Sequence, residues 1–330
     1  MRVGFGAWQR LGLAAAVIVM TALFVVAGRA ESGYPQRPVR IVLPYGPGGV
    51  ADVTTRLIAQ KLSERMGQNF FVDNRPGAGG IVAAKSALSF PADGYTLFLT
   101  GNGAAISESL FQSLPYSVEH DFASISMFAK FDILLATKAD AKLDTVAKLV
   151  AYAKDNPGKL NFGAIAIGST QDLSAELFRM VTGINAAIVT FRTTPELVSA
   201  IVRGDVDVGF DYYAAFNPMV AAKQIKVVAV SGDEPDAALP GVPTVKSSGY
   251  PDYVVNSWNS LSAPAGIPSD IVMKLNAGIR DALQLPDVRA TMATLGMEPW
   301  ASTPDELSQR MRTDAEKWRQ VIEKAGIPKQ

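Results

Sequence analysis

The sequence predicts an α/β fold in which two doubly wound lobes are joined by two hinge strands. Apolar strand patterns alternate with helical patterns along most of the 330 residues, and this alternation favours parallel sheets covered by helices. The alternation runs once up to residue 131 and then starts again near Ile133. The remaining tail is helical after one strand-like segment, so it has too little sheet to form a third domain.

The first unit begins with a continuous apolar strand, which is typical of a sheet that is covered on both faces. The helix after it carries apolar residues at helical spacing, and Gly67 follows as a typical helix stop. The expected elements in order are strand 39–43, helix 53–66, strand 70–72, helix 81–88 and strand 95–99. This βαβαβ order predicts a parallel sheet.

The second unit repeats the alternation. One of its helices has a clear start, because Thr194 is a good N-cap and Pro195 suits the first helical position. The expected elements in order are strand 133–136, helix 145–154, strand 160–163, helix 171–181, strand 187–191, helix 195–202, strand 206–210, helix 214–222 and strand 225–230.

The tail most simply returns to cover the first unit. Its expected elements are strand 254–261 and helices 269–283, 286–295 and 304–325. This predicts a discontinuous lobe 1 of residues 31–131 and 232–330, a lobe 2 of residues 132–231, and two crossings near 125–132 and 230–256. Two lobes with two hinge strands form a clamshell that closes on a ligand.

Residues 1–30 resemble a secretory signal peptide. Arg2 and Arg10 precede an apolar run, and the small residues Gly28 and Ala30 follow it at cleavage-site spacing. The alternative is a retained membrane anchor. Without this segment the chain has 31 − 3 = 28 basic and 31 acidic residues, a net charge of −3. We therefore expect a periplasmic protein that does not bind nucleic acid or anionic lipid.

Several kinds of chemistry have no residues to support them. The chain has no cysteine, which excludes disulfides, thiolate metal sites, cysteine nucleophiles and lipoprotein attachment. Its single histidine, His120, lies in a polar stretch and is expected to be a surface residue. No Ser lies in a G-x-S-x-G motif. We expect no catalytic residues, no metal site, no cofactor and no enzymatic activity.

The segment Gly46-x-Gly48-x-x-Ala51 after the first strand fits a dinucleotide-binding fingerprint, with Asp73 where the ribose-binding acid should stand. Three observations disfavour that interpretation. The chain has an export segment, Pro47 removes a backbone N–H from the phosphate loop, and no histidine or cysteine is present for hydride chemistry.

Three glycine-rich or hydroxyl-rich segments follow strands in both units: 45–52, 100–103 and 164–170. In α/β sheets such loops face the crevice at the carboxyl ends of the strands. Each helix start offers unpaired N–H groups and the positive end of a helix dipole. Two starts facing each other would hold a carboxylate without any lysine or arginine.

Sequence motifs along the whole mature chain resemble the substrate-binding proteins of tripartite tricarboxylate transporters, the Bug family. They stand in the family's order: Tyr34–Arg40, Pro44–Asp52, Asn74–Gly80, Asp93–Leu97, Leu114–Tyr116, Asp121–Phe122, Asn156–Gly163, Gly204–Asp207, Phe210–Asp211, Leu239–Thr244 and Ala263–Pro268. The resemblance implies a type II periplasmic binding protein fold and a small ligand that carries a carboxylate.

The resemblance also implies where the ligand lies and which partners it meets. The expected ligand-binding residues are Tyr45, Gly46, Gly48, Gly49, Asp52, Thr100, Gly101, Asn102, Gly168, Ser169, Thr170, Asp172, Phe191, Arg192 and Asp211. The expected partners are the carboxylate and the membrane permease subunits of the transporter, with the receptor itself a monomer. The alternative is a ligand-presenting subunit for a membrane sensor kinase, which would use the same clamshell.

The chain departs from the family pattern in three places: Asp172 replaces a histidine, 191–193 lacks the usual Y-[KR]-G, and 100–103 has fewer hydroxyls. Asp172 would repel a ligand carboxylate nearby. It either points away from the cleft, is neutralised by Arg192, or contacts a polar group of the ligand. The last two alternatives predict that citrate binds poorly. We therefore expect a monocarboxylate, or a dicarboxylate held at its two ends, with aromatic acids as candidates.

Overall fold

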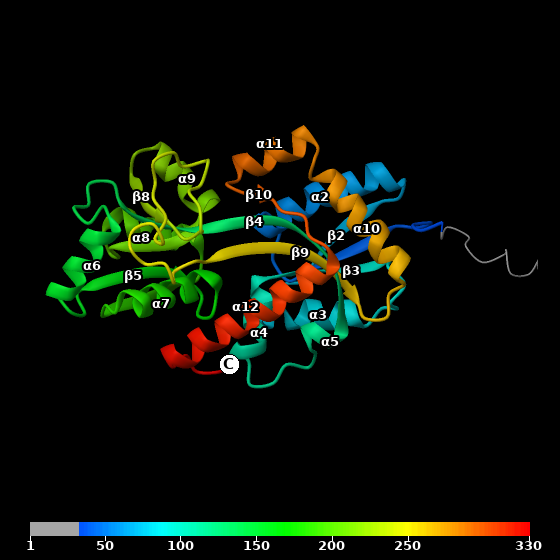
Figure 1. Cartoon of the computed structure of the whole chain (residues 1–330), viewed down its shortest axis with the longest axis horizontal. Helices are drawn as coiled ribbons and strands as arrows, with labels where there is room; N and C mark the ends of the chain where they lie inside the picture. The colour runs from blue at the N-terminus through cyan, green and yellow to red at the C-terminus, as the bar shows by residue number, and fades with distance from the viewer. Residues whose placement is uncertain (1–32) are drawn as a thin grey trace, which may run out of the picture. The chain divides into compact units, whose positions relative to one another are not determined.

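The computed structural model describes residues 33–330, of which residues 37–330 form one compact unit. The predicted signal peptide at residues 1–30 lies outside the described residues. Within the described part of the chain, no helix is long and apolar enough to cross a membrane. Figure 1 shows the described residues in colour.

The strands form one mixed sheet in the order β2-β1-β3-β9-β4-β7-β5-β6, and β8 and β10 also pair with β4. Their bounds are β1 Val39–Leu43, β2 Phe70–Asn74, β3 Thr96–Gly101, β4 Phe122–Lys138, β5 Leu160–Ile165, β6 Ala186–Phe191, β7 Val208–Tyr212, β8 Ile225–Val230, β9 Asn256–Pro264 and β10 Glu298–Pro299. The neighbours β2-β1-β3 and β6-β5-β7 are parallel, as the alternating pattern predicts.

The helices cover the sheet. Their bounds are α2 Val50–Met66, α3 Ile81–Leu88, α4 Asn102–Leu110, α5 Val118–Asp121, α6 Val146–Asp155, α7 Thr170–Thr182, α8 Thr194–Arg203, α9 Tyr213–Ala221, α10 Ser269–Ala282, α11 Pro286–Thr294 and α12 Pro304–Ala325, with a 3₁₀ turn at Ala78–Gly80. Capping explains the clearest starts: Ser169 caps α7, Thr193 caps α8 one residue before the predicted Thr194, and Thr303 caps α12 in a capping box.

The long strand β4 belongs to two groups of strands. Its first part, up to Asp132, pairs with β9, and its second part, from Ile133, pairs with β7 and β8. We call β1, β2, β3, β9, β10 and the first part of β4 the first strand group, and we include in it helices α2 to α5 and the loops around them. The second strand group is β5 to β8 and the rest of β4, with helices α6 to α9 and the loops around them. Figure 1 shows β4 and β9 running side by side out of the first group. The lobe boundaries remain a prediction.

Several elements differ from the expectation, and the short α5 and β10 are not predicted at all. Helix α4 occupies residues 102–110, where the sequence predicts a glycine-rich loop at 100–103 and no helix after it, because small and polar residues hide its helical period. Strand β4 begins at Phe122, well before the expected Ile133. Its pairing with β9 shifts register between Ser124 and Ser126 and again between Met127 and Ala129. Such irregularities break the two-residue alternation that marks a strand.

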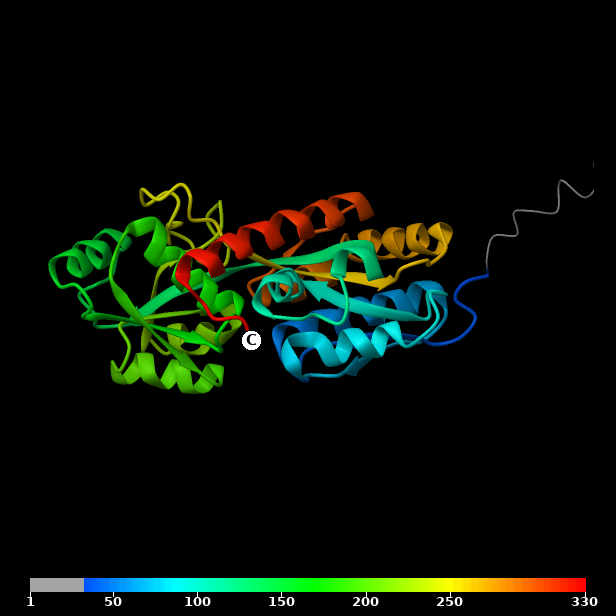
Figure 2. The same cartoon turned by 90° about the horizontal axis from the view of Figure 1, so that it is seen from below.

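The C-terminal helix α12 packs against both strand groups. It contacts α4 and β4, as expected for a tail that covers the first unit, and it also contacts α7 of the second group. Trp318 of α12 is only 1% exposed. Figures 1 and 2 show α12 in red, lying beside α4 and reaching toward α7.

Candidate functional site

A cavity of about 880 Å³ lies where the loops after the strands of both groups meet. From the first group, some but not all residues of segments 44–53, 77–80 and 98–111 line it, with Tyr116, Phe131 and 257–259. From the second, residues within segments 165–171 and 211–215 line it with Thr194, and Leu295 and Gln330 complete the wall. The starts of α2, α4, α7 and α8 all contribute to this wall. The cavity therefore collects several helix N-termini, as the positions of the three loops predict.

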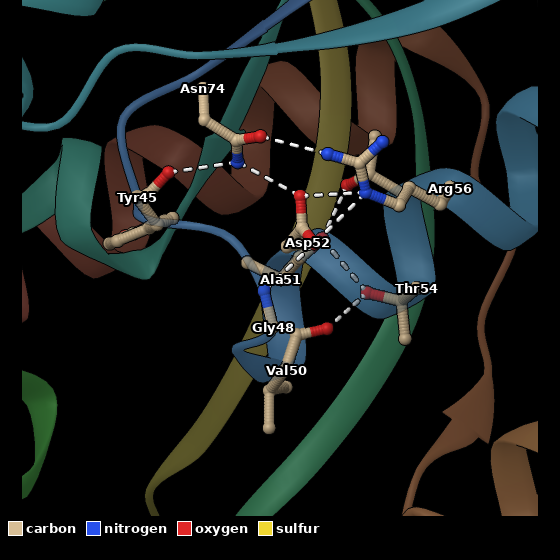
Figure 3. Close-up of polar contacts among 9 residues, drawn as sticks. Tyr45, Gly48, Val50, Ala51, Asp52, Thr54, Arg56 and Asn74 are labelled. Atoms are coloured by element: carbon tan, nitrogen blue, oxygen red, sulfur yellow. Dashed lines mark hydrogen bonds and ion pairs between the residues drawn. The ribbon is translucent and has the colours of Figure 1, made fainter.

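The first loop is held in shape by Asp52 (Figure 3). Its carboxylate accepts hydrogen bonds from the Gly48 N–H at 2.9 Å and from Asn74 Nδ2 at 2.8 Å. Arg56 Nε donates to both carboxylate oxygens at 3.0 Å, and Asn74 Nδ2 also donates to the Tyr45 carbonyl. Gly48 has φ 83°, which favours glycine. Asp52 thus stabilises the conformation of the loop and does not itself line the cavity.

The second loop repeats this arrangement. The N–H of Gly168, which has φ 77°, donates to Asp172 Oδ2 at 2.9 Å, and Ser169 caps the helix by accepting from the Asp172 N–H at 3.1 Å. Asp172 is buried and does not line the cavity. Among the described residues no contact joins Asp172 to Arg192, whose own N–H donates to Glu196. Asp172 thus lies outside the cavity lining, as in the first of the three alternatives, and its part in ligand binding stays a prediction.

The two aspartates differ in their electrostatics. Burial acts to raise the pKa of Asp52, but hydrogen bonds from Arg56, Gly48 and Asn74 outweigh it and leave the pKa below its ordinary value. No guanidinium hydrogen-bonds to Asp172, and burial raises its pKa to about 6 although the Gly168 N–H and the charge of Arg179 act to lower it. The two loops therefore share one hydrogen-bond pattern, but the pKa of the aspartate is lowered in the first loop and raised in the second.

The cavity offers uncharged donors to a ligand. In α2 the first helical hydrogen bond is that of Val53 to Gly49, so Val50 and Ala51 N–H have no acceptor within the helix. In α7 the corresponding first bond is that of Leu173 to Ser169, which leaves the N–H groups at 170 and 171 in the same position. These groups carry the positive ends of the two helix dipoles, which favour an anion.

Asp211 is the only charged side chain among the described residues that line the cavity. Its carboxylate accepts from Gln171 Nε2 at 3.1 Å, the Tyr212 N–H at 2.8 Å and Thr194 Oγ1 at 2.9 Å. Burial raises its pKa, with these neutral donors opposing the shift. No lysine, arginine or histidine of the described chain stands in the lining, so an anion here would be held by neutral groups.

The predicted site residues divide by position. Those that line the cavity are Tyr45, Gly48, Gly49, Gly101, Asn102, Gly168, Ser169, Thr170 and Asp211. Those that lie outside its lining are Gly46, Asp52, Thr100, Asp172, Phe191 and Arg192. Thr100, for instance, turns its hydroxyl to Ser260 and Ser262 of β9 within the sheet.

Sequence reasoning missed some lining residues. Gln171 and Tyr212 stand next to predicted positions, and their amide and hydroxyl are the polar groups that motif matching passed over. Ser257 and Asn259 lie on β9, which is buried along its whole length. Polar residues at regular spacing in a buried strand are the pattern that would have indicated them.

Comparison with known proteins identifies relatives of this chain. The sequence pattern of the tripartite tricarboxylate transporter family receptor matches residues 54–327. Protein BugT of Bordetella pertussis is 31% identical over 304 residues, which cover 92% of this chain and 93% of BugT.

Two solved structures resemble the fold closely. Rpa4515 of R. palustris, solved with adipate, has a TM-score of 0.79 and 32% identity, covering 89% of this chain and 98% of that one. MatC of Rhodopseudomonas palustris, solved with bound malate, has a TM-score of 0.75 and 28% identity, covering 88% and 100%. These matches confirm the predicted fold class, a mixed α/β periplasmic binding protein fold.

Proposed function

This chain belongs to the tripartite tricarboxylate transporter receptor family, and we propose that it captures a small carboxylate in the 880 Å³ cavity and delivers it to the permease of such a transporter. The family serves transport and is not a family of enzymes, in agreement with the sequence prediction. The export segment at residues 1–30 supports delivery from the periplasm. Closure of two lobes over the ligand would give the permease a distinct form to recognise.

The observation that carries the proposal is the convergence of helix N-termini on a cavity with no cationic side chain. Backbone N–H groups and a helix dipole stabilise a carboxylate with no lysine or arginine. Neutral donors also release a ligand more readily than a buried ion pair, which suits a receptor that must hand its ligand on.

The lining also supports a ligand class. Much of the wall is apolar, with Phe98, Ile106, Phe131 and Trp258 from the first strand group and Ile165 from the second. Two relatives were solved with dicarboxylates of different length, one with adipate and one with bound malate. We propose a monocarboxylate with an apolar body or a dicarboxylate held at its two ends. Citrate, with three charges and no cation to meet them, should bind weakly.

A thermal-shift screen of carboxylates tests this function. The mature protein is melted with malate, adipate, benzoate and citrate. A ligand at 100 times its Kd stabilises the folded state by about 2.7 kcal/mol. At least one of the first three acids should raise the melting temperature in a saturable way, and more than citrate does.

The Gly49→Val variant tests whether the ligand binds in this cavity. Gly49 lines the cavity with an ordinary φ of −79°, and an added Cβ would meet no atom within 4 Å. Valine should therefore fit the fold while filling space beside the α2 N-terminus. We expect the ligand-free melting temperature to stay within a few degrees and the ligand-induced shift to vanish. An unchanged shift in this variant would place the ligand elsewhere.

A further inference from the structure

Asn102 links the two strand groups across the cavity. It is the first residue of α4 in the first group, and its Nδ2 donates to Oγ1 of Thr170, the first residue of α7 in the second group, at 3.0 Å. Both side chains line the cavity and both are largely buried. Asn102 therefore stands where the two helix N-termini face each other.

The orientation of the Asn102 amide is set by a third residue. Trp318 of α12 donates its indole N–H to Asn102 Oδ1 at 2.7 Å. An indole N–H can only donate, so the atom that faces Trp318 must be the amide oxygen. The amide nitrogen is then turned toward Thr170 and the cavity. One of its two hydrogens binds Thr170, and the described residues supply no acceptor for the other.

We propose that Trp318, which does not line the cavity, is a positioning residue for ligand recognition: its indole N–H holds the Asn102 amide with the N–H₂ group directed at the ligand carboxylate. This inference rests on the proposed carboxylate function. A flipped amide would present its oxygen to the anion and would turn an attractive contact into a repulsive one. Packing alone cannot choose between the two, because the nitrogen and oxygen of an amide have nearly the same size.

The position of Trp318 fits this role. It is 1% exposed and lies on the helix that contacts both α4 and α7. Its partner Asn102 belongs to a wider set of neutral groups, since Tyr212 places its hydroxyl near the side chains of Thr170 and Ser257. In a cavity without lysine or arginine in its described lining, the direction of each neutral dipole decides whether an anion is attracted.

Trp318→Phe removes the N–H and keeps most of the apolar packing. Isothermal titration with adipate and with adipamide, its neutral diamide, measures the effect. We expect the Kd for adipate to rise about tenfold, the loss of one oriented hydrogen bond. The Kd for adipamide should hardly change, because an amide ligand accepts from or donates to either face of Asn102. A purely structural role would weaken both ligands alike, and that result would overturn the proposal.

Trp300→Phe is the matched control. Trp300 is a partly buried indole packed on the core, with the Arg310 guanidinium over its ring, and like Trp318 it lies outside the cavity lining. Its loss should leave the preference for adipate over adipamide unchanged. A collapse of that preference in both tryptophan variants would also overturn the proposal.

A measurement without ligand separates this inference from the proposed function. In ¹H–¹⁵N spectra of the ligand-free protein, Asn102→Asp should move the Trp318 indole resonance, since its acceptor becomes a carboxylate, and Trp318→Phe should move the Asn102 amide resonances. An unmoved indole resonance in Asn102→Asp would overturn the positioning role even if Trp318→Phe did not fold. If the resonances move while no carboxylate binds the wild type, the anchoring stands and the proposed function fails.

Discussion

Asp52 and Asp172 occupy the same position in their helices and accept the same hydrogen bond from a left-handed glycine, yet their environments have opposite consequences. Arg56 lies against Asp52, whereas burial dominates at Asp172 and raises its pKa to about 6. A carboxyl whose pKa is raised on folding binds more protons in the folded state. The contribution of Asp172 to the free energy of unfolding therefore falls as the pH rises from about 4 through about 6.

Asp172→Asn should stabilise the protein at pH 7.5, because the amide oxygen still accepts from Gly168 without a buried charge. The gain expected is about 1–3 kcal/mol, and it should disappear below pH 4, where Asp172 is already neutral. Urea unfolding between pH 4 and pH 8 measures it. If the wild-type and variant curves run parallel across this range, Asp172 does not titrate as described.

Asp52→Asn provides the contrasting case at the matched position. The pKa of Asp52 is lowered on folding, so its contribution is present above its unfolded value near 3.8 and is lost as the pH falls through the folded value. The variant should be destabilised at pH 7.5, and the difference from wild type should shrink in acid. A stabilised variant at pH 7.5 would show that Arg56 does not compensate the charge.

At the scale of elements, β4 changes its pairing partners between Asp132 and Ile133. The end of β8 and the start of β9 contact β4 at this point. Ser231 Oγ accepts from the Ile133 N–H at 2.8 Å and donates to the Val255 carbonyl, and Asn256 Nδ2 donates to Asp132 Oδ1 at 2.7 Å. These contacts tie both strand crossings together. We therefore predict that the hinge between the two predicted lobes lies at this cluster.

Gly232→Ala tests how tightly the crossings are packed. A Cβ at Gly232 would lie 2.0 Å from Asp132 Oδ2, so the carboxylate would have to leave Asn256. We expect a loss of about 1–3 kcal/mol in the free energy of unfolding. In an Asp132→Ala background, which removes the obstructing oxygen, the same change should cost much less. Equal costs in both backgrounds would contradict this contact.

The sequence predicts the helices that have side-chain caps and many of the residues that line the cavity. It does not predict elements whose local sequence pattern is weak. Helices α7, α8 and α12 begin within a residue of their predicted starts because each has a side-chain cap. Helix α4 has none, and the side chain of its first residue, Asn102, accepts a hydrogen bond from Trp318, more than two hundred residues away. No local pattern encodes such a partner, nor does any show that Asp172 turns toward Gly168.

At the scale of the whole unit, residues from distant parts of the chain build a single cavity whose only charged described lining side chain is an acid, Asp211. Recognition of an anion there depends on directed neutral dipoles from α2, α4 and α7. We therefore predict strong discrimination between a carboxylate and a neutral group of the same shape. We also predict that adding negative charge, as in citrate, weakens binding.

The most direct test is isothermal titration of the mature protein with the carboxylate that stabilises it most and with the primary amide of that acid. We predict that one carboxylate binds per protein and that the Kd of the amide is about a hundredfold higher, because several charge-assisted hydrogen bonds are lost. Equal affinities for acid and amide, or no binding of any carboxylate in the panel, would contradict this prediction.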